Sequence, residues 1–201
     1  MPKKRRPHDE LKPAVLAAAR SSVVEGGISA VSARGIAEDV GVSVGTLYNL
    51  FGHLDGIIRA MNVVRIAELQ VALVAALDAA DDEPEARLLA MAEAYFDFAL
   101  SEPNLWEALF RYSTVTPSGG EIEAAEATLF SLLRRAAGDE AEGGAADESL
   151  RTLWAAVHGV VELAMSRRTV GADMDTARYH ARLVVMAGLR GYHALRSEGI
   201  L

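Results

Sequence analysis

The sequence predicts an all-α fold of about nine helices, and three observations support this prediction. Apolar residues recur every three to four residues along most of the 201-residue chain, which is the spacing of one helix face. Glycines and prolines fall between these periodic segments, where helices end and begin. No segment shows the alternation of a convincing β-strand. The composition, with 51% hydrophobic and 24% charged residues, is that of a folded globular protein.

The first three predicted helices are close together in the sequence. Ser32 and Ser43 are placed to cap the second and third helices, and glycines mark the ends of the first and second. These helices cover about residues 11–25, 33–40 and 44–51.

The remaining helices are longer, and several begin or end at recognisable signals. Pro84 and Pro103 stand where first-turn prolines occur, so each is predicted to open a helix. The segment 138–149 is acidic, rich in glycine and without apolar spacing, and we expect a mobile loop there. The other helices are predicted at about residues 54–78, 121–137, 150–168 and 175–197.

The two short helices indicate a helix-turn-helix. Only the turn Gly41-Val42-Ser43 separates them, and their apolar residues can pack on the first helix, which leaves the outer side of residues 44–51 displayed. Small side chains at Val44 and Gly45 would let this helix approach the bases of a major groove. Hydroxyl groups of Thr46 and Tyr48 can bind phosphates, and Asn49 can bond to a base edge. A helix hairpin without any ligand is the alternative.

The charge distribution points to the same end of the chain. Residues 1–65 contain nine basic and six acidic residues, a balance of +3, whereas the rest contain 11 and 22, a balance of −11. A basic end joined to an acidic body indicates that the N-terminal part faces a polyanion. For the basic residues at the N-terminus taken alone, a solvated tail without a partner is the alternative.

The stretch AVSARGIAEDVGVSVGTLYNLFGHLDGII resembles the DNA-binding domain of the TetR (tetracycline-repressor) family, over about residues 11–60. The matching positions are Ser32, Ile36, Ala37, Gly41, Val42, Ser43, Thr46, Leu47, Tyr48 and Phe51. The resemblance implies an all-helical homodimer that binds an operator in double-stranded DNA at one end and a small-molecule effector in the body. It also implies phosphate contacts from Ser32, Thr46 and Tyr48. Arg34, Val44, Gly45 and Asn49 would lie nearest the bases, with Ser43 and His53 at the ends of the displayed helix.

Two positions depart from the family pattern. Val44 replaces a frequent Lys or Arg, and His53-Leu54-Asp55 replaces a Ser-Lys-Glu sequence, so phosphate-binding charge is lost. The basic arm can compensate, because each neutralised phosphate releases counterions. The arm's cations are Lys3, Lys4, Arg5 and Arg6.

The body of the chain carries a weaker resemblance. The segment LWAAVHGVVEL, residues 153–163, is similar to a Trp-x-x-x-His-Gly stretch of one TetR subgroup, with Trp154 and His158 on one helical face. For His158 a hydrogen-bonded core or dimer-contact role is favoured over an effector contact. Together with these two residues, a stripe of large apolar residues is predicted either to line an effector pocket or to form plain core. The stripe consists of Met61, Tyr95, Phe96, Trp106 and Phe110.

The last two helices carry more apolar surface than one body can cover, which predicts a two-fold interface. Its predicted residues are Trp154, Val161, Met165, Val184, Gly188, Gly191, Tyr192 and Leu195. The expected organisation is therefore a basic arm (1–10), a three-helix helix-turn-helix domain (11–56) and a helical effector-binding and dimerisation domain (57–201).

Several function classes lack support in the sequence. The absence of cysteine excludes disulfides and thiolate chemistry. No histidine follows Glu or Asp by three residues, and no Gly-rich phosphate loop or Gly-x-Ser-x-Gly elbow occurs, so we expect no enzyme, cofactor or metal. No apolar run approaching a membrane span and no signal peptide are evident, which predicts a cytoplasmic protein without a membrane partner.

These observations together predict a DNA-binding transcriptional regulator, a repressor that a small hydrophobic ligand releases from a pseudo-palindromic operator. A helical enzyme, or a ligand-independent DNA-binding or scaffold protein, stays open as the alternative. A strongly salt-dependent shift of a promoter fragment would distinguish a DNA-binding regulator from an enzyme or a scaffold.

Overall fold

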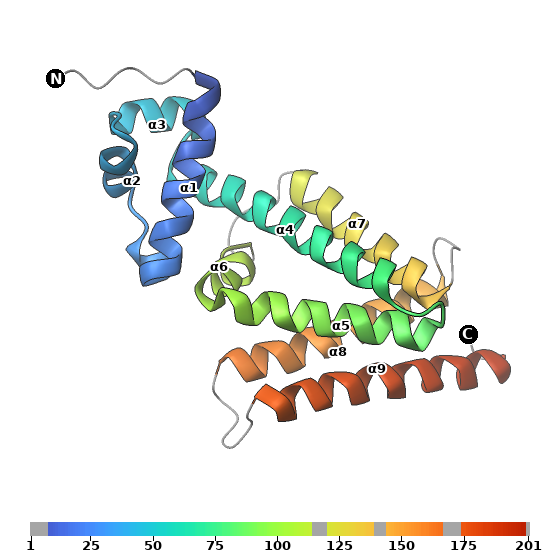
Figure 1. Cartoon of the computed structure of the whole chain (residues 1–201). Helices are drawn as coiled ribbons and strands as arrows, with labels where there is room; N and C mark the ends of the chain where they lie inside the picture. The colour runs from blue at the N-terminus through green and yellow to red at the C-terminus, as the bar shows by residue number, and fades with distance from the viewer. Residues whose placement is uncertain (1–7, 114–119, 139–143, 167–173, 200–201) are drawn as a thin grey trace. The chain divides into compact units, whose positions relative to one another are not determined.

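The computed structural model describes residues 8–113, 120–138, 144–166 and 174–199, and within these ranges the chain is helical with no strand (Figure 1). The all-α prediction and the helix count are confirmed. The elements are α1 (His8–Gly26), the 3₁₀ helix η1 (Ile28–Ala30), α2 (Ala33–Val40), α3 (Val44–Phe51), α4 (Leu54–Ala79), α5 (Pro84–Ser101), α6 (Pro103–Ser113), α7 (Gly120–Ala137), α8 (Ala145–Met165) and α9 (Met174–Ser197).

The chain forms two compact units that are not continuous in sequence. One contains the residues up to Ala67 together with residues 102–123, and the other contains residues 68–101 and 124–201. The boundary predicted after residue 56 therefore differs from the structure, because the first part of α4 and all of α6 group with the helix-turn-helix. The expected arm is also shorter, since α1 begins at His8 and not near residue 11.

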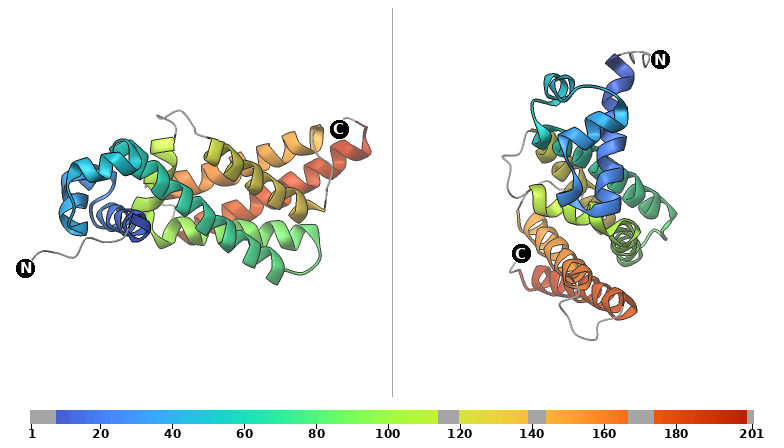
Figure 2. Two further views of the ribbon diagram at one scale, coloured as in Figure 1. Left: turned by 90° about the horizontal axis from the view of Figure 1, so that it is seen from above. Right: turned by 90° about the vertical axis from the view of Figure 1, so that its left-hand side faces the viewer.

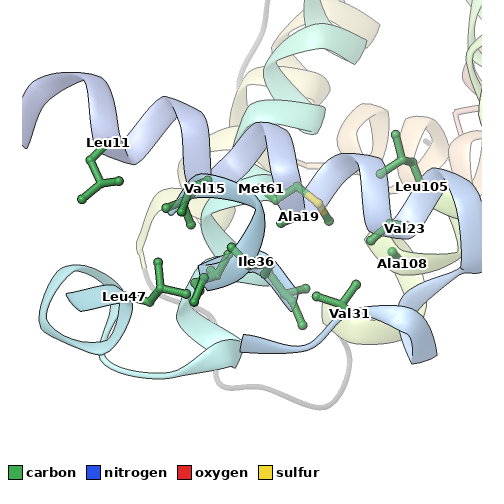
Figure 3. Close-up of a cluster of buried hydrophobic side chains, with 14 residues drawn as sticks. Leu11, Val15, Ala19, Val23, Val31, Ile36, Leu47, Met61, Leu105 and Ala108 are labelled. Atoms are coloured by element: carbon green, nitrogen blue, oxygen red, sulfur yellow. The ribbon is translucent and has the colours of Figure 1, made fainter. Parts of the chain in front are cut away.

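The first unit is built around an apolar cluster to which α1, α2, α3, α4 and α6 contribute (Figure 3). Val15, Val23, Ile36 and Leu47 have no exposed surface. Leu105 of α6 belongs to the same cluster. Burying such side chains stabilises a fold by about 1.5–3 kcal/mol each relative to leaving them exposed, which holds the two short helices in place.

Polar contacts also tie α6 to this unit. The Glu102 carboxylate, just before α6, lies 2.5 Å from Arg20 Nη2 of α1 and 2.9 Å from Arg65 Nη1 of α4. The Asn104 side-chain amide donates to the Val24 carbonyl oxygen at 2.9 Å. The Asn62 amide donates to the Ala108 carbonyl oxygen at 3.3 Å. The position of α6 thus depends on specific hydrogen bonds as well as on packing.

The second unit centres on α9, which packs along α8 and α5. Both views of Figure 2 show α8 and α9 side by side. The buried face of α9 repeats at helical spacing, with Ala177, Ala181, Val185 and Leu189. Small residues at the first two positions allow the helices to approach closely. Arg178 adds an ion pair to Glu93 of α5 at 2.9 Å and another to Asp97.

Two expectations from the sequence need correction. The loop predicted over 138–149 is helical from Ala145 onward, where Asp147 and Glu148 favour the positive end of α8 and Asp147 pairs with Arg134 at 2.9 Å. Residues 139–143 lie outside the described ranges. Among the described helices, α4 is long and apolar enough to span a membrane by length and composition, contrary to the prediction from the sequence. It packs as a core helix, with Ile57, Leu69 and Leu73 buried.

Candidate nucleic-acid interface and ligand cavity

Two serine caps define the helices of the helix-turn-helix. The Ser32 hydroxyl accepts a hydrogen bond from the Gly35 amide at 3.1 Å at the start of α2, and Ser43 accepts from the Thr46 amide at 3.1 Å at the start of α3. Between the helices Gly41 adopts φ 73° and ψ 38°, a left-handed conformation that suits glycine. The caps and the turn predicted from the sequence are therefore confirmed.

The outer side of α3 presents polar side chains around a buried anchor. Leu47 is fully buried, whereas Tyr48 is 41% exposed and Asn49 is exposed. The Ser43 and Thr46 hydroxyl oxygens lie 2.9 Å apart, so the pair shares one hydrogen bond and keeps one hydroxyl proton for another acceptor. Ser32 accepts at its cap and likewise retains a proton. These hydroxyls can donate to phosphate oxygens without disturbing the caps.

Two small residues at the start of α3 have different surroundings. Val44 is half-buried and packs against the apolar cluster, so its side chain is less available than the sequence predicted. Gly45 is exposed, and a Cβ atom there would meet only Ser43 Oγ, at the ordinary contact distance of 3.6 Å. The chain's own packing does not require glycine at residue 45. A close approach by another molecule would require it.

The basic residues predicted to contact DNA are only partly described. Arg34 and His53 are exposed, at α2 and just before α4. Lys3, Lys4, Arg5 and Arg6 lie outside the described residues. The surface thus combines an anchored helix, exposed hydroxyl and amide groups, and one arginine, which is the donor set that binds a nucleic-acid backbone and base edges.

Two family profiles match most of the chain. The profile of bacterial regulatory proteins of the tetR family matches residues 15–61, and that of the tetracyclin repressor-like C-terminal domain matches residues 88–187. The chain belongs to the TetR family.

Solved structures agree with TetR membership at the level of the fold. A TetR transcriptional regulator from Rhodococcus sp. RHA1 is 20% identical with a TM-score of 0.72, over 91% of this chain and 98% of that one. A protein of unknown function from the same organism is 23% identical with a TM-score of 0.75, over 94% and 97%. A putative transcriptional regulator from Pseudomonas aeruginosa PAO1 is 21% identical with a TM-score of 0.68, over 94% and 95%. No curated protein matches the chain.

TetR proteins are DNA-binding transcriptional regulators and not enzymes, and they typically form homodimers that respond to small molecules. Membership therefore confirms the regulator predicted from the sequence. Within the described part of this TetR chain, no group of three or more histidine and carboxylate side chains could hold a metal ion.

The second unit of this TetR protein contains an apolar cavity of about 30 Å³. Tyr95 and Trp154 are its two aromatic lining residues, and the others include Leu88, Met91 and Val157. A single water needs about 10–15 Å³ on this measure, whereas ligand sites usually occupy about 300–1,000 Å³. In this conformation the cavity accommodates no more than a few atoms.

A chain of aromatic contacts borders the cavity. The Tyr95 hydroxyl and His158 Nδ1 form a hydrogen bond of 2.9 Å, and the Trp154 ring stacks on the imidazole at 5.2 Å with an interplanar angle of 8°. Burial raises the pKa of Tyr95 well above 10.0, and the charge of Glu162 adds to this effect. Burial lowers the pKa of His158 below 6.5, against an opposing effect of Glu162. Both groups are therefore neutral at pH 7.

The residues of the predicted apolar stripe are divided between the two units. Met61, Trp106 and Phe110 belong to the first unit, where Met61 joins the core cluster and the other two rings lie 4.5 Å apart. Phe96 is buried beneath the Arg178 guanidinium, 4.9 Å from its ring centre. Of the stripe only Tyr95 lines the cavity. The sequence did not show that α6 packs with α1 in the first unit.

A groove of about 390 Å³ lies along α8 and α9, and small and apolar residues make up most of its lining, with Glu148 at one end of α8. Val184, Gly188, Gly191, Tyr192 and Leu195 line it, as predicted for the interface, together with Ala156. Exposed apolar residues that the prediction did not name extend this surface. They are Leu163, Tyr179 and Leu183.

Three predicted interface residues have other surroundings in the chain. Val161 is 1% exposed, so its side chain has no surface to offer a second copy. A Cβ atom at Gly188 would lie 2.9 Å from Leu153 Cδ1, which means that this glycine lets α9 approach α8 within one chain. Trp154 lines the internal cavity instead. Gly191 has open space around it, with nothing within 4 Å of an added Cβ.

Proposed function

We propose that this TetR-family protein is a cytoplasmic repressor that binds a pseudo-palindromic operator as a homodimer and leaves it when a small hydrophobic ligand binds the second unit. The observation that supports DNA binding most directly is the construction of α3. Its inner side chain Leu47 is fully buried while Tyr48 and Asn49 are exposed, so a rigid anchor displays polar groups on a short helix.

Each group on this helix has a role in the proposal. Hydroxyl protons of Ser32 and of the Ser43–Thr46 pair, together with Tyr48, would bind phosphates and set the position of the helix. Asn49 and Arg34 would bond to base edges, since both side chains can bond in a bidentate manner. Gly45 would allow the helix backbone to approach the groove, and His53 would add a backbone contact.

The α8–α9 surface is proposed as the dimer interface. It combines exposed apolar residues, such as Leu163 and Leu195, with the open glycines Gly159 and Gly191. Pairing the same two helices from both copies would give a four-helix bundle that covers this surface. A dimer would place two copies of α3 about 34–36 Å apart, or at a related spacing, in successive major grooves.

Release by a ligand requires two conformations of different ligand affinity. The cavity of about 30 Å³ is too small for an effector, so a bound molecule would have to enlarge it. A ligand that binds only the enlarged form shifts the population toward that form, and this difference in affinity is what can weaken operator binding.

Tyr48→Phe tests the proposal. The operator is first selected from a random-sequence DNA pool with the wild-type protein, and affinity is then measured by fluorescence anisotropy across a salt series. Loss of one phosphate hydrogen bond from each α3 should cost about 1 kcal/mol per subunit, so the affinity should fall by about 10- to 30-fold. The melting temperature should not change, because Tyr48 is exposed. Wild-type affinity in this variant, or failure to select any DNA, would contradict the proposal.

A further inference from the structure

The second unit holds an unused hydrogen-bond donor beside its apolar cavity. Trp154 Nε1 is shielded from solvent and makes no hydrogen bond of normal geometry. Its weak contact with the Tyr95 hydroxyl opposes the rise in the pKa of that phenol that burial causes. The indole lines the cavity together with Tyr95 and nine apolar side chains. A buried donor without an acceptor destabilises a fold, so its retention calls for an explanation.

The surroundings fix the donor in place. Trp154 stacks on His158, and its ring lies 6.0 Å from the Phe130 ring in an edge-on arrangement, so the indole is held between two aromatic neighbours. The Tyr95 hydroxyl is already engaged with His158 Nδ1 at 2.9 Å. An incoming acceptor would therefore meet a donor that is oriented in advance and makes no hydrogen bond of normal geometry.

The electrostatic setting selects against charged molecules. Tyr95 and His158 are both neutral at pH 7, and the carboxylate that influences both is Glu162. None of the described residues that line the cavity is cationic. An anion would be desolvated there without a counter-charge, which is costly, whereas a neutral acceptor avoids that cost.

We infer that the effector is a neutral, largely apolar molecule with one carbonyl-type acceptor that bonds to Trp154 Nε1 while the rest of the molecule fills the enlarged cavity. This inference rests on the proposed function and names the chemistry of its ligand. A single ordered water on Nε1 is the competing occupant, because the cavity has room for one.

The test uses acetophenone and isopropylbenzene, which have nearly the same shape and differ in the carbonyl oxygen. The chain contains two tryptophans, Trp106 and Trp154, so a ¹⁵N-labelled sample gives two indole N–H signals. Trp154→Phe assigns them and also removes the donor while it keeps a ring to stack on His158. Acetophenone should move the Trp154 indole proton downfield and leave Trp106, which is buried in the first unit, unmoved. Isopropylbenzene should cause no downfield shift.

Affinity gives a second readout. The preference for acetophenone over isopropylbenzene, measured as a ratio of dissociation constants, should fall about fivefold in Trp154→Phe, the effect of one net hydrogen bond. Tyr95→Phe leaves the indole intact and should keep the preference for acetophenone. This variant provides the test of the inference if Trp154→Phe does not fold. The inference would be overturned if both probes shifted the Trp154 signal equally or if neither shifted it. It would also be overturned if Trp154→Phe kept the preference for acetophenone or if Tyr95→Phe abolished it.

Operator binding by the ligand-free protein is measured in parallel, so that a failure of the inferred ligand chemistry can be told apart from a failure of the proposed function. Operator binding without a response of Trp154 to the ketone would refute the ligand chemistry and leave the DNA-binding proposal intact. A Trp154 response in a protein that selects no operator would refute the proposed function instead.

Discussion

Gly45→Ala should make the protein more stable and a weaker DNA binder at the same time. Gly45 is the second residue of α3, and an added Cβ would meet only Ser43 Oγ at 3.6 Å. The methyl group therefore fits the folded chain without moving any neighbour. Against DNA it would stand on the exposed side of the helix, where we propose the closest approach to the bases.

The two effects can be estimated separately. Replacing glycine by alanine within a helix stabilises it by about 0.5–1 kcal/mol, because the unfolded chain loses conformational freedom. In a domain of this size about 1 kcal/mol raises the melting temperature by roughly 2–4 °C. On DNA, the loss of one hydrogen bond from each recognition helix costs about 1 kcal/mol, and two helices in a dimer would lower affinity by about 30-fold.

Thermal unfolding followed by circular dichroism and anisotropy titration of the selected operator measure the two quantities on the same preparation. Opposite signs cannot come from misfolding, which would lower both stability and affinity. A Gly45→Ala protein that binds the operator like the wild type would show that α3 does not approach the groove at this residue. A lower melting temperature would show that the helix has no room for the methyl group.

Three further predictions concern other parts of the chain. Deleting residues 1–6 should lower operator affinity and reduce the slope of log affinity against log salt by about 0.9 for each phosphate that the arm no longer neutralises; equal slopes with and without these residues would make them a solvated tail. Gly191→Glu should give monomers in sedimentation with an unchanged helical spectrum, because this site is open within the chain; a dimer of wild-type strength would exclude Gly191 from the interface. Glu102→Gln should lower stability by about 2–3 kcal/mol, because the Arg65 side chain, which is 5% exposed, loses its ion pair with Glu102. The loss is smaller than for a fully buried pair because Glu102 is partly exposed. Denaturant unfolding at wild-type stability would contradict this.

The packing of α9 on α8 decides which glycine substitution tests the predicted dimer interface. A Cβ atom at Gly188 would lie 2.9 Å from Leu153 Cδ1 of the same chain, so Gly188→Glu would disturb the packing of α9 on α8 as well as any contact with a second copy. Loss of the dimer in that variant would then have two explanations, a change within one chain and a change at the interface. Gly191→Glu reduces this ambiguity because Gly191 lines the same groove and an added Cβ there meets nothing within 4 Å.

The sequence predicted the local structure of the helix-turn-helix well because local interactions determine it. The caps at Ser32 and Ser43, the glycine turn at Gly41 and the burial of Leu47 each depend on neighbours within a few residues. Helix starts at Pro84 and Pro103 were predictable for the same reason.

Long-range packing was not predictable in the same way. An apolar face shows that α6 is buried, but it does not show which partner covers it, so the sequence left open whether Trp106 and Phe110 line a pocket or form core. Neither residue lines the cavity of the second unit. The Tyr95–His158 hydrogen bond joins residues 63 positions apart. The sequence favoured a hydrogen-bonded core or dimer-contact role for His158, but it did not identify Tyr95 as the partner. Val161, which was predicted at the interface, is buried within its own chain, because helical periodicity cannot separate a face buried by the same chain from one buried by another copy.

The placement of α6 has a practical consequence for building chimaeric regulators. Exchanging DNA-binding heads between two such proteins by cutting at the end of the helix-turn-helix sequence would leave behind Leu105 and Ala108, which complete the core of the head, and Glu102, which neutralises Arg65. The grafted head would then meet a foreign α6 whose side chains were selected for a different partner. A transferable head is a two-piece fragment, and a successful graft would have to carry α6 along with residues up to Ala67.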